Sequence, residues 1–153
     1  ANGLFIIYFS LLISFLSWGY LVPKISKNVS DAIKLLKFGA PLNLIVLAFI
    51  IYLGPKAGAY HWAFFAVSSV FLSLTQPAVG MAFSLSNAGK ALTSFNLLLF
   101  IGAFALQWII GAIIDLTMNL GFSEISGFRF AMIFFLLTSS FSYLFFLIKN
   151  SKN

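Results

Sequence analysis

The sequence contains no cysteine and a single histidine, His61. Without a thiol, the chain can form neither a disulfide nor a thiolate metal site. One histidine cannot by itself make a metal centre or a Ser-His-Asp triad. We therefore expect no bound metal and no cofactor.

Charge is also scarce, because only 8% of the 153 residues are charged and 61% are hydrophobic. A soluble domain carries charge on about a quarter of its residues. The 20 phenylalanines cannot all be hidden inside a globule of this size. The composition therefore predicts a protein whose solvent is the lipid bilayer. The net charge of +6 then indicates membrane topology and not nucleic-acid binding.

Five apolar segments approach the length of about 20 residues that a helix needs to cross a bilayer. They are residues 3–22, 38–53, 60–83, 97–116 and 128–148. Pro23 closes the first, and the short second one gains length from DAIKLLK, where Ser30 could cap the helix and Asp31 would lie in the first turn. None shows the alternating polarity of barrel strands. We predict an all-α polytopic membrane helix bundle with five transmembrane helices.

The cations are distributed unevenly over the connections between these segments. Seven fall on one side and two on the other: Lys24, Lys27, Lys34, Lys37, Lys90, Lys149 and Lys152 against Lys56 and Arg129. Cytoplasmic loops carry the excess of Lys and Arg. The N-terminus is therefore predicted to lie outside and the C-terminus in the cytoplasm.

Polar residues recur at helical spacing within three of the spans. The first has Ser10, Ser14 and Ser17; the third has Ser69, Ser73, Gln76 and Gly80; the fourth has Asn96, Phe100, Ala103, Gln107, Gly111 and Asp115. Each set shares one helical face, and Gln107 lies near the middle of its span. Small residues and serines usually let helices approach closely. The Gln76 and Gln107 amides must find partners, either across helices or in a wet cavity.

Other residues have simpler interpretations. Pro77 removes a backbone hydrogen bond and predicts a kink in the third span. Asp115 lies close to the outer boundary, where Arg129 is its candidate ion-pair partner. No span holds a pair of carboxylates, and the sequence has no phosphate-binding glycine loop and no nucleophile–base pair. We therefore do not expect an enzyme.

Residues 77–115, PAVGMAFSLSNAGKALTSFNLLLFIGAFALQWIIGAIID, resemble the tenth and eleventh helices of major facilitator superfamily transporters, especially bacterial sugar-phosphate-permease-like members. The shared pattern is a Gly-basic-Ala hinge, an Asn, and a Gly-Ala-Phe-x-x-Gln-x-x-x-Gly run. Here it comprises Gly89-Lys90-Ala91, Asn96, Gly102-Ala103-Phe104, Gln107 and Gly111. Pro23, in the connection between the first and second spans, departs from the family, because it stands where the loop between helices eight and nine often has an acid.

The resemblance implies that the five spans are helices eight to twelve of a longer protein in the bacterial inner membrane, whose N-terminal helices precede this chain. Such a protein moves a small polar solute by alternating access. The implied cavity residues are Gln107, Gln76, Ser14, Ser73 and Phe100, with Gly89, Lys90 and Asn96 forming the cytoplasmic hinge and gate between two cavity helices.

Two other classes of protein remain open. One is a five-span membrane scaffold or assembly subunit, which would have no wet cavity lined by Gln76 and Gln107. The other is a membrane-embedded enzyme, which needs ionisable residues clustered at one depth. Only Asp115, Glu124 and Arg129 near the outer surface could supply such a cluster.

Overall fold

The computed structural model describes residues 2–150, and this part of the chain is helical without any β-strand. Its elements are α1 (Asn2–Ile25), α2 (Val29–Leu53), η1 (Gly54–Lys56), α3 (Ala59–Ser69), η2 (Val70–Leu74), α4 (Thr75–Ala82), α5 (Leu85–Asn119) and α6 (Glu124–Lys149). Five helical segments are long and apolar enough to cross a membrane: Asn2–Ile25, Val29–Lys56, Ala59–Ala82, Leu85–Asn119 and Glu124–Lys149. The prediction of an all-helical chain with five such helices is confirmed.

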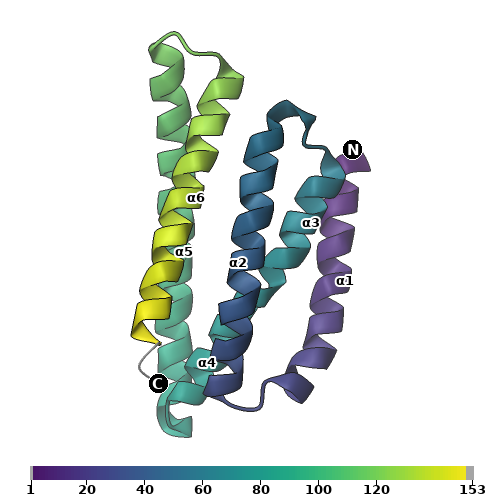
Figure 1. Cartoon of the computed structure of the whole chain (residues 1–153). Coiled ribbons are helices and arrows are strands. Elements are labelled where there is room, and N and C mark those ends of the chain that lie inside the picture. The colour runs from purple at the N-terminus through teal and green to yellow at the C-terminus, as the bar shows by residue number, and fades with distance from the viewer. Residues whose placement is uncertain (1, 151–153) are drawn as a thin grey trace.

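The helices run up and down beside one another, with turns at alternating ends (Figure 1). α5 and α6 form an antiparallel pair at one side, and α6 packs against α2. α2 also packs against α3, η2 and α4, while α1 lies on the far side against α3 and η2. α2 is therefore the central helix that joins the two halves of the bundle.

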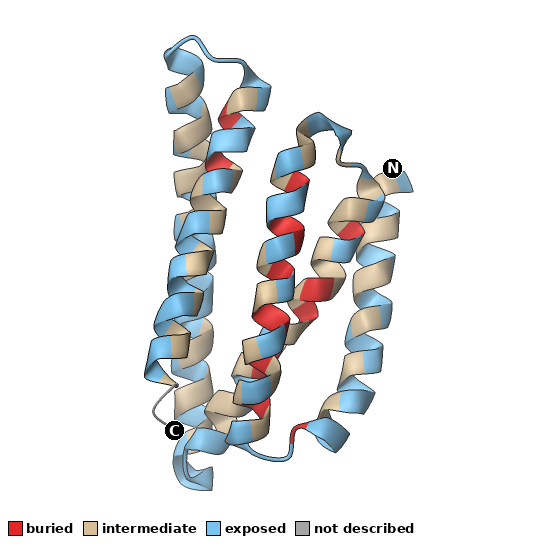
Figure 2. Ribbon diagram, viewed as in Figure 1, coloured by how far each residue is buried: buried red, intermediate tan, exposed pale blue. Residues whose placement is uncertain are grey.

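Buried residues follow the same arrangement, because most of them lie along α2 (Figure 2). Leu36 and Leu47 of α2 and Leu74 of η2 are among the most deeply buried side chains. In the described chain, neither α1 nor α5 contains a buried residue. The outer helices thus leave large apolar surfaces uncovered, as a lipid environment allows.

The start of α2 agrees only in part with the sequence prediction. DAIKLLK is helical and Asp31 lies in the first turn, as predicted, but the cap is Asn28 and not Ser30. The Asn28 side chain accepts a hydrogen bond from the Asp31 backbone N–H at 2.9 Å. The Asp31 carboxylate in turn accepts one from the Lys27 N–H at 3.1 Å. Asn is at least as good a cap as Ser, and its earlier position adds two residues, Val29 and Ser30, to the helix.

Pro23 does not end the first helix, which continues to Ile25. The helical ladder persists beyond it, since the Ser26 N–H donates to the Val22 carbonyl at 2.9 Å. A proline in the last turn removes only one such bond. Pro77, from which a kink was predicted, lies within α4, which begins at Thr75. The irregular part of the third span comes just before it, because the α-helical hydrogen bonds give way to i→i+3 bonds over η2, Val70–Leu74.

The hinge implied at Gly89 and Lys90, with Asn96 at the gate, is wrong as local structure, because all three residues lie within the helix α5. The chain reverses instead at Phe83 and Ser84, both of which have extended backbone conformations. The Ser84 carbonyl accepts the N–H groups of Asn87 and Ala88, both at 2.8 Å, so the helix starts directly afterwards. Gly89 makes no turn, and Asn96 caps no helix.

α5 is unusually long as a result. Its 35 residues extend about 52 Å at 1.5 Å per residue, well beyond the roughly 30 Å of a hydrocarbon core. The polar first turns, which include Lys90, therefore project from the apolar layer. Lys90 is exposed, as are Lys24 and Lys149 at the same end of the bundle. Lys152, counted with these cations, lies outside the described residues.

Candidate functional site

Two of the predicted site residues are joined directly. The Gln76 side-chain Nε2 on α4 donates a hydrogen bond to Asn96 Oδ1 on α5 at 3.1 Å. Gln76 is exposed and Asn96 is partly exposed, so this amide pair lies on the surface of the bundle. Asn96, assigned from sequence to the gate, and Gln76, assigned to the cavity, thus belong to one contact between neighbouring helices.

Gln107 continues the same face of α5. It follows Asn96 by eleven residues (107 − 96), which is close to three helical turns. Its side chain is exposed and makes no hydrogen bond within residues 2–150. We call this surface the open face of α5; it comprises Asn96, Phe100, Ala103, Gln107 and Gly111. Phe100 is 76% exposed, and a Cβ added at Gly111 would meet nothing within 4 Å.

α6 packs closely against the C-terminal part of α5. A Cβ added at Gly127 of α6 would lie 2.7 Å from Thr117 Oγ1 and 3.4 Å from the Ile114 Cα of α5, which marks the close approach of the two helices. The Thr117 hydroxyl donates back to the Ile113 and Ile114 carbonyls, so it needs no partner on α6. This close contact uses neither the Asn96 nor the Gln107 amide.

The two predicted serines lie elsewhere. The Ser14 hydroxyl donates to the Ser10 carbonyl at 2.7 Å on α1, whose packing partners are α3 and η2. The Ser73 hydroxyl donates to the Val70 carbonyl at 2.7 Å within η2. Both hydroxyls are satisfied by their own helix, and the structure does not bring them together with Gln107.

The predicted outer ion pair is not formed. Asp115 and Arg129 are both exposed, and no ion pair links them within the described part of the chain. Arg129 instead lines a groove between α6 and the ends of α2 and α3, together with Trp62 and Pro55. Asp115 does not line this groove, a difference that the sequence could not reveal.

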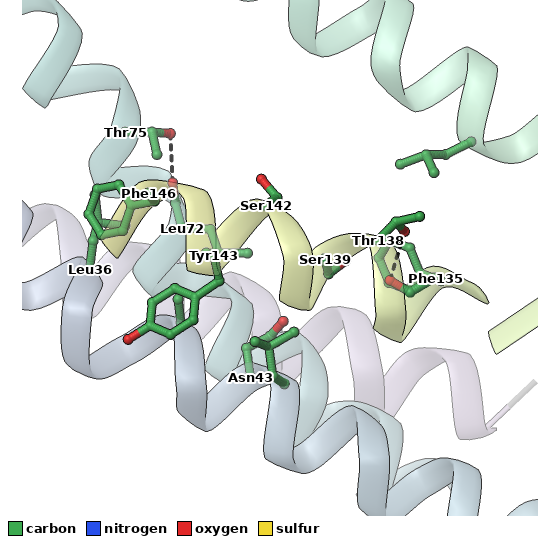
Figure 3. A pocket seen from close by; sticks show the side chains of 13 residues that line it. Leu36, Asn43, Leu72, Thr75, Phe135, Thr138, Ser139, Ser142, Tyr143 and Phe146 are labelled. Carbon is green, nitrogen blue, oxygen red and sulfur yellow. Dashed lines mark hydrogen bonds between the residues drawn. The ribbon is translucent and has the colours of Figure 1, made fainter. Parts of the chain in front are cut away.

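A pocket that the sequence did not predict lies between α2, the η2–α4 segment, α5 and α6 (Figure 3). It has a volume of about 440 Å³. Its lining is mostly apolar, with six polar residues: Asn43, Thr75, Thr138, Ser139, Ser142 and Tyr143. None of the predicted cavity residues lines it.

Most polar groups of this pocket are already occupied by the protein. Asn43 is 7% exposed and donates through Nδ2 to the Phe65 carbonyl at 3.2 Å and to Ser68 Oγ at 2.9 Å. The Tyr143 hydroxyl donates to the Lys37 carbonyl at 2.7 Å. Thr75 and Thr138 donate to carbonyls of their own helical segments, at 2.7 and 3.0 Å (Figure 3).

Three polar atoms of the pocket remain available within the described chain: Asn43 Oδ1 and the Ser139 and Ser142 hydroxyls. No Asp, Glu, Lys, Arg or His lines the pocket. It can therefore offer hydrogen bonds to an uncharged group but no charge to an ion. The sequence contained a signal for this pocket. Asn43 is the one strongly polar residue of the second span, and hydroxyl side chains interrupt the apolar fifth span at residues 138–142.

A hydrogen bond also joins α2 to the end of α6. The Lys37 ammonium donates to the Asn150 carbonyl at 2.9 Å, and Asn150 caps α6. A cation at a helix C-terminus satisfies a free carbonyl and complements the helix dipole. Lys37, assigned from sequence only to topology, thus also ties two helices together.

The chain matches no protein-family model, no curated protein and no solved structure. Its residues also offer no metal centre, since no group of three His, Cys, Asp or Glu side chains within residues 2–150 could hold an ion. The chemistry of the site therefore reduces to amides and hydroxyls that bind uncharged or hydrogen-bonding groups within an apolar bundle.

Proposed function

We propose that this chain is the C-terminal part of a secondary transporter of the major facilitator type, which moves a small polar solute by alternating access. The observation that carries this proposal is the open face of α5, where the exposed Gln107 amide makes no hydrogen bond within residues 2–150 and Asn96 stays partly exposed beside α4. Gln76 extends the surface onto α4 through its hydrogen bond to Asn96.

Amides are costly on a surface that faces lipid. An amide that loses water without gaining a hydrogen bond is destabilised by roughly 1–3 kcal/mol. Gln107 lies about midway along the apolar part of α5, so it cannot reach the headgroups as an end residue would. Water or polar groups of further helices must therefore meet this face. A cavity between the two halves of a transporter supplies both.

The rest of the proposal follows from topology. If all five helices span the membrane, the two termini lie on opposite sides of it. Most of the exposed cations lie at the end of the bundle that holds Lys24, Lys90 and Lys149. We assign this end of the bundle to the cytoplasmic side of a bacterial inner membrane, and the end that holds the N-terminus to the outer side. Helices that precede this chain in the longer protein form the other wall of the cavity.

A cysteine scan tests whether water reaches the open face. The chain has no cysteine of its own, so thiols can be placed at will. Ala103→Cys and Gln107→Cys lie on the open face, and Ala105→Cys is the control at nearly the same depth on another exposed side of α5. The native protein, with other cysteines replaced, is treated in its membrane with a charged thiol reagent.

Thiols react as thiolates, which form only where water is present, so we expect positions 103 and 107 to react at least about tenfold faster than position 105. Equal, slow reaction at all three positions would contradict the proposal. That result would mean that the open face is covered by lipid or by a dry helix contact. The latter would favour a five-span scaffold, whose amides bind partner subunits.

A further inference from the structure

A second hollow of the bundle lies at the end opposite the basic turns. It is a groove of about 490 Å³ between the first turns of α6 and the ends of α2 and α3. We call it the outer groove; it is lined by Ile50, Ile51, Gly54, Pro55, Trp62, Ile125, Ser126, Phe128, Arg129 and Met132. The open face of α5 contributes none of these residues, so the outer groove is separate from the proposed transport path.

The lining combines apolar walls with one cation. Arg129 is exposed and has no carboxylate partner in the described part of the chain. None of the three acidic residues, Asp31, Asp115 and Glu124, lines the groove. Lys56, the other cation at this end, does not line it either. The guanidinium is thus the only charge in the groove, and its planar set of donors suits a phosphate.

Trp62 adds a second donor at the same level. Its ring packs edge-on against Phe65, with 6.1 Å between the ring centroids, and its indole N–H has no partner within residues 2–150. Tryptophan and arginine are typical of membrane–water interfaces, where one end of the side chain is apolar and the other is wet. The groove lies beside the turns at residues 54–58 and 120–123 (Figure 1). We infer that it lies at the headgroup level of that leaflet, because the turns between spanning helices emerge from the apolar layer.

The size and lining of the groove narrow the choice of occupant. A helix with its side chains is about 10 Å across, so the groove could hold little more than one helical turn. Free phosphate would leave the apolar walls formed by Ile50, Ile51 and Met132 without a partner. A flexible acyl chain fills an irregular apolar groove, and its attached phosphate would meet Arg129.

We propose that the outer groove binds one anionic phospholipid of the leaflet at this end, with its phosphate on the Arg129 guanidinium and the Trp62 N–H, and one acyl chain between α2 and α6. Apolar walls alone do not select this lipid, because the surrounding chains are equally apolar. Selection comes from the unpaired charge of Arg129. A membrane-surface cation favours an anionic lipid by roughly fivefold.

Photo-crosslinking in vesicles tests the proposal. The native protein is reconstituted with a trace of phosphatidylglycerol or phosphatidylcholine that carries a photoreactive acyl chain, and the label is mapped by mass spectrometry. We expect phosphatidylglycerol to label residues 125–132 about fivefold more than phosphatidylcholine does. Labelling of the exposed apolar residues Leu137, Phe141 and Leu144 of α6 serves as the internal reference and should not distinguish the two lipids.

The charge variants decide between a site and a general surface effect. Arg129→Gln should abolish the preference for phosphatidylglycerol at residues 125–132, and Lys56→Gln should leave it intact. Unchanged labelling at Leu137, Phe141 and Leu144 shows that each variant is inserted normally. The proposal is overturned if both lipids label the groove equally, if the preference survives Arg129→Gln, or if Lys56→Gln removes it as well.

Discussion

At the scale of single residues, one polar cluster fastens the centre of the bundle. Asn43 of α2 donates to Ser68 Oγ at 2.9 Å, and Ser68, which is 2% exposed, donates to the Phe65 carbonyl at 2.8 Å. Asn43 also reaches that carbonyl at 3.2 Å. The three residues form a closed set of hydrogen bonds between α2 and α3, in the region where the bundle is best buried.

A double-mutant cycle measures this connection. We expect Asn43→Ala and Ser68→Ala each to lower the free energy of unfolding, and the pair to show a coupling energy of roughly 0.6–1.7 kcal/mol, as for interhelical hydrogen bonds in membranes. Unfolding in mixed detergent micelles gives the four free energies. Strictly additive losses would show that the Asn43–Ser68 bond contributes nothing beyond the packing of each residue.

Gly39 marks the closest approach of α2 to the irregular part of the third span. A Cβ added there would collide with the ring of Phe71, which packs edge-on against Trp18 with 4.8 Å between the ring centroids. We expect Gly39→Ala to destabilise the protein by about 1–3 kcal/mol, because Phe71 must leave its place and disturb the contact with α1.

Gly102 is the matched control, since it lies within α5 and a Cβ added there would meet nothing within 4 Å. Gly102→Ala should be neutral or stabilising by up to about 1 kcal/mol, from helix propensity. The measurement is the difference in unfolding free energy between the two variants. A similar effect at both positions would refute the close approach at Gly39.

Sequence reasoning at this scale identified polar residues but could not pair them. Gln76, Asn96 and Gln107 were predicted to be important, yet the hydrogen bond between the first two depends on how α4 lies against α5. Asn43 was visible as the one strongly polar residue of its span, but its partner Ser68 is on another helix. Arg129 was predicted to pair with Asp115, and only the geometry of α6 shows that it turns to the outer groove.

At the scale of secondary-structure elements, the third span is a broken helix. α3 ends at Ser69, η2 occupies Val70–Leu74, and α4 starts at Thr75, two residues before Pro77. Ser69 and Ser73 donate their hydroxyls to the Ala66 and Val70 carbonyls, at 2.6 and 2.7 Å. These bonds, together with the missing N–H of Pro77, stabilise the change of helical pitch.

Replacing the proline should make this span more regular. Pro77→Ala restores a backbone donor, so we expect slower amide exchange over residues 70–77 and a weaker Gln76–Asn96 contact as α4 turns. Hydrogen exchange measured by mass spectrometry reports the amide exchange rates over residues 70–77. Pro55→Ala, in the η1 turn, is the control. Exchange that stays as fast as in the unmodified protein would show that η2 does not depend on Pro77.

The start of α5 shows why the predicted hinge was misplaced. The resemblance implied a hinge at Gly89 and Lys90, which lie in a stretch polar enough for a turn. Polarity reports contact with water, however, and a helix longer than the apolar layer also has polar turns. The actual reversal, at Phe83 and Ser84, has only two residues and lacks proline and glycine, so no turn signal marked it. Apolar length, by contrast, predicted all five spans.

At the scale of the whole molecule, the bundle has two differently charged ends. Lys24, Lys90 and Lys149 are exposed at one end, while Lys56 and Arg129 lie near the turns at the other. Net charge and its distribution can be read from sequence, and the alternating helices bring the separate basic segments to one end of the fold (Figure 1). The uncovered faces of α1 and α5 could not be predicted, because covering them depends on which helices meet.

This charge asymmetry gives a direct test of orientation. Gly58, before α3, and Gly89, near the start of α5, lie at opposite ends, and a Cβ added at either position would meet nothing within 4 Å. The cytoplasmic loops should carry the excess of cations. We therefore expect Gly58→Cys to react with a membrane-impermeant maleimide added to intact cells, and Gly89→Cys to react only after the membrane is permeabilised. The opposite pattern would invert the topology and would place the outer groove, with Arg129, in the cytoplasmic leaflet. The lipid site could persist in that leaflet, because its chemistry depends on Arg129 and the apolar walls and not on which leaflet surrounds them.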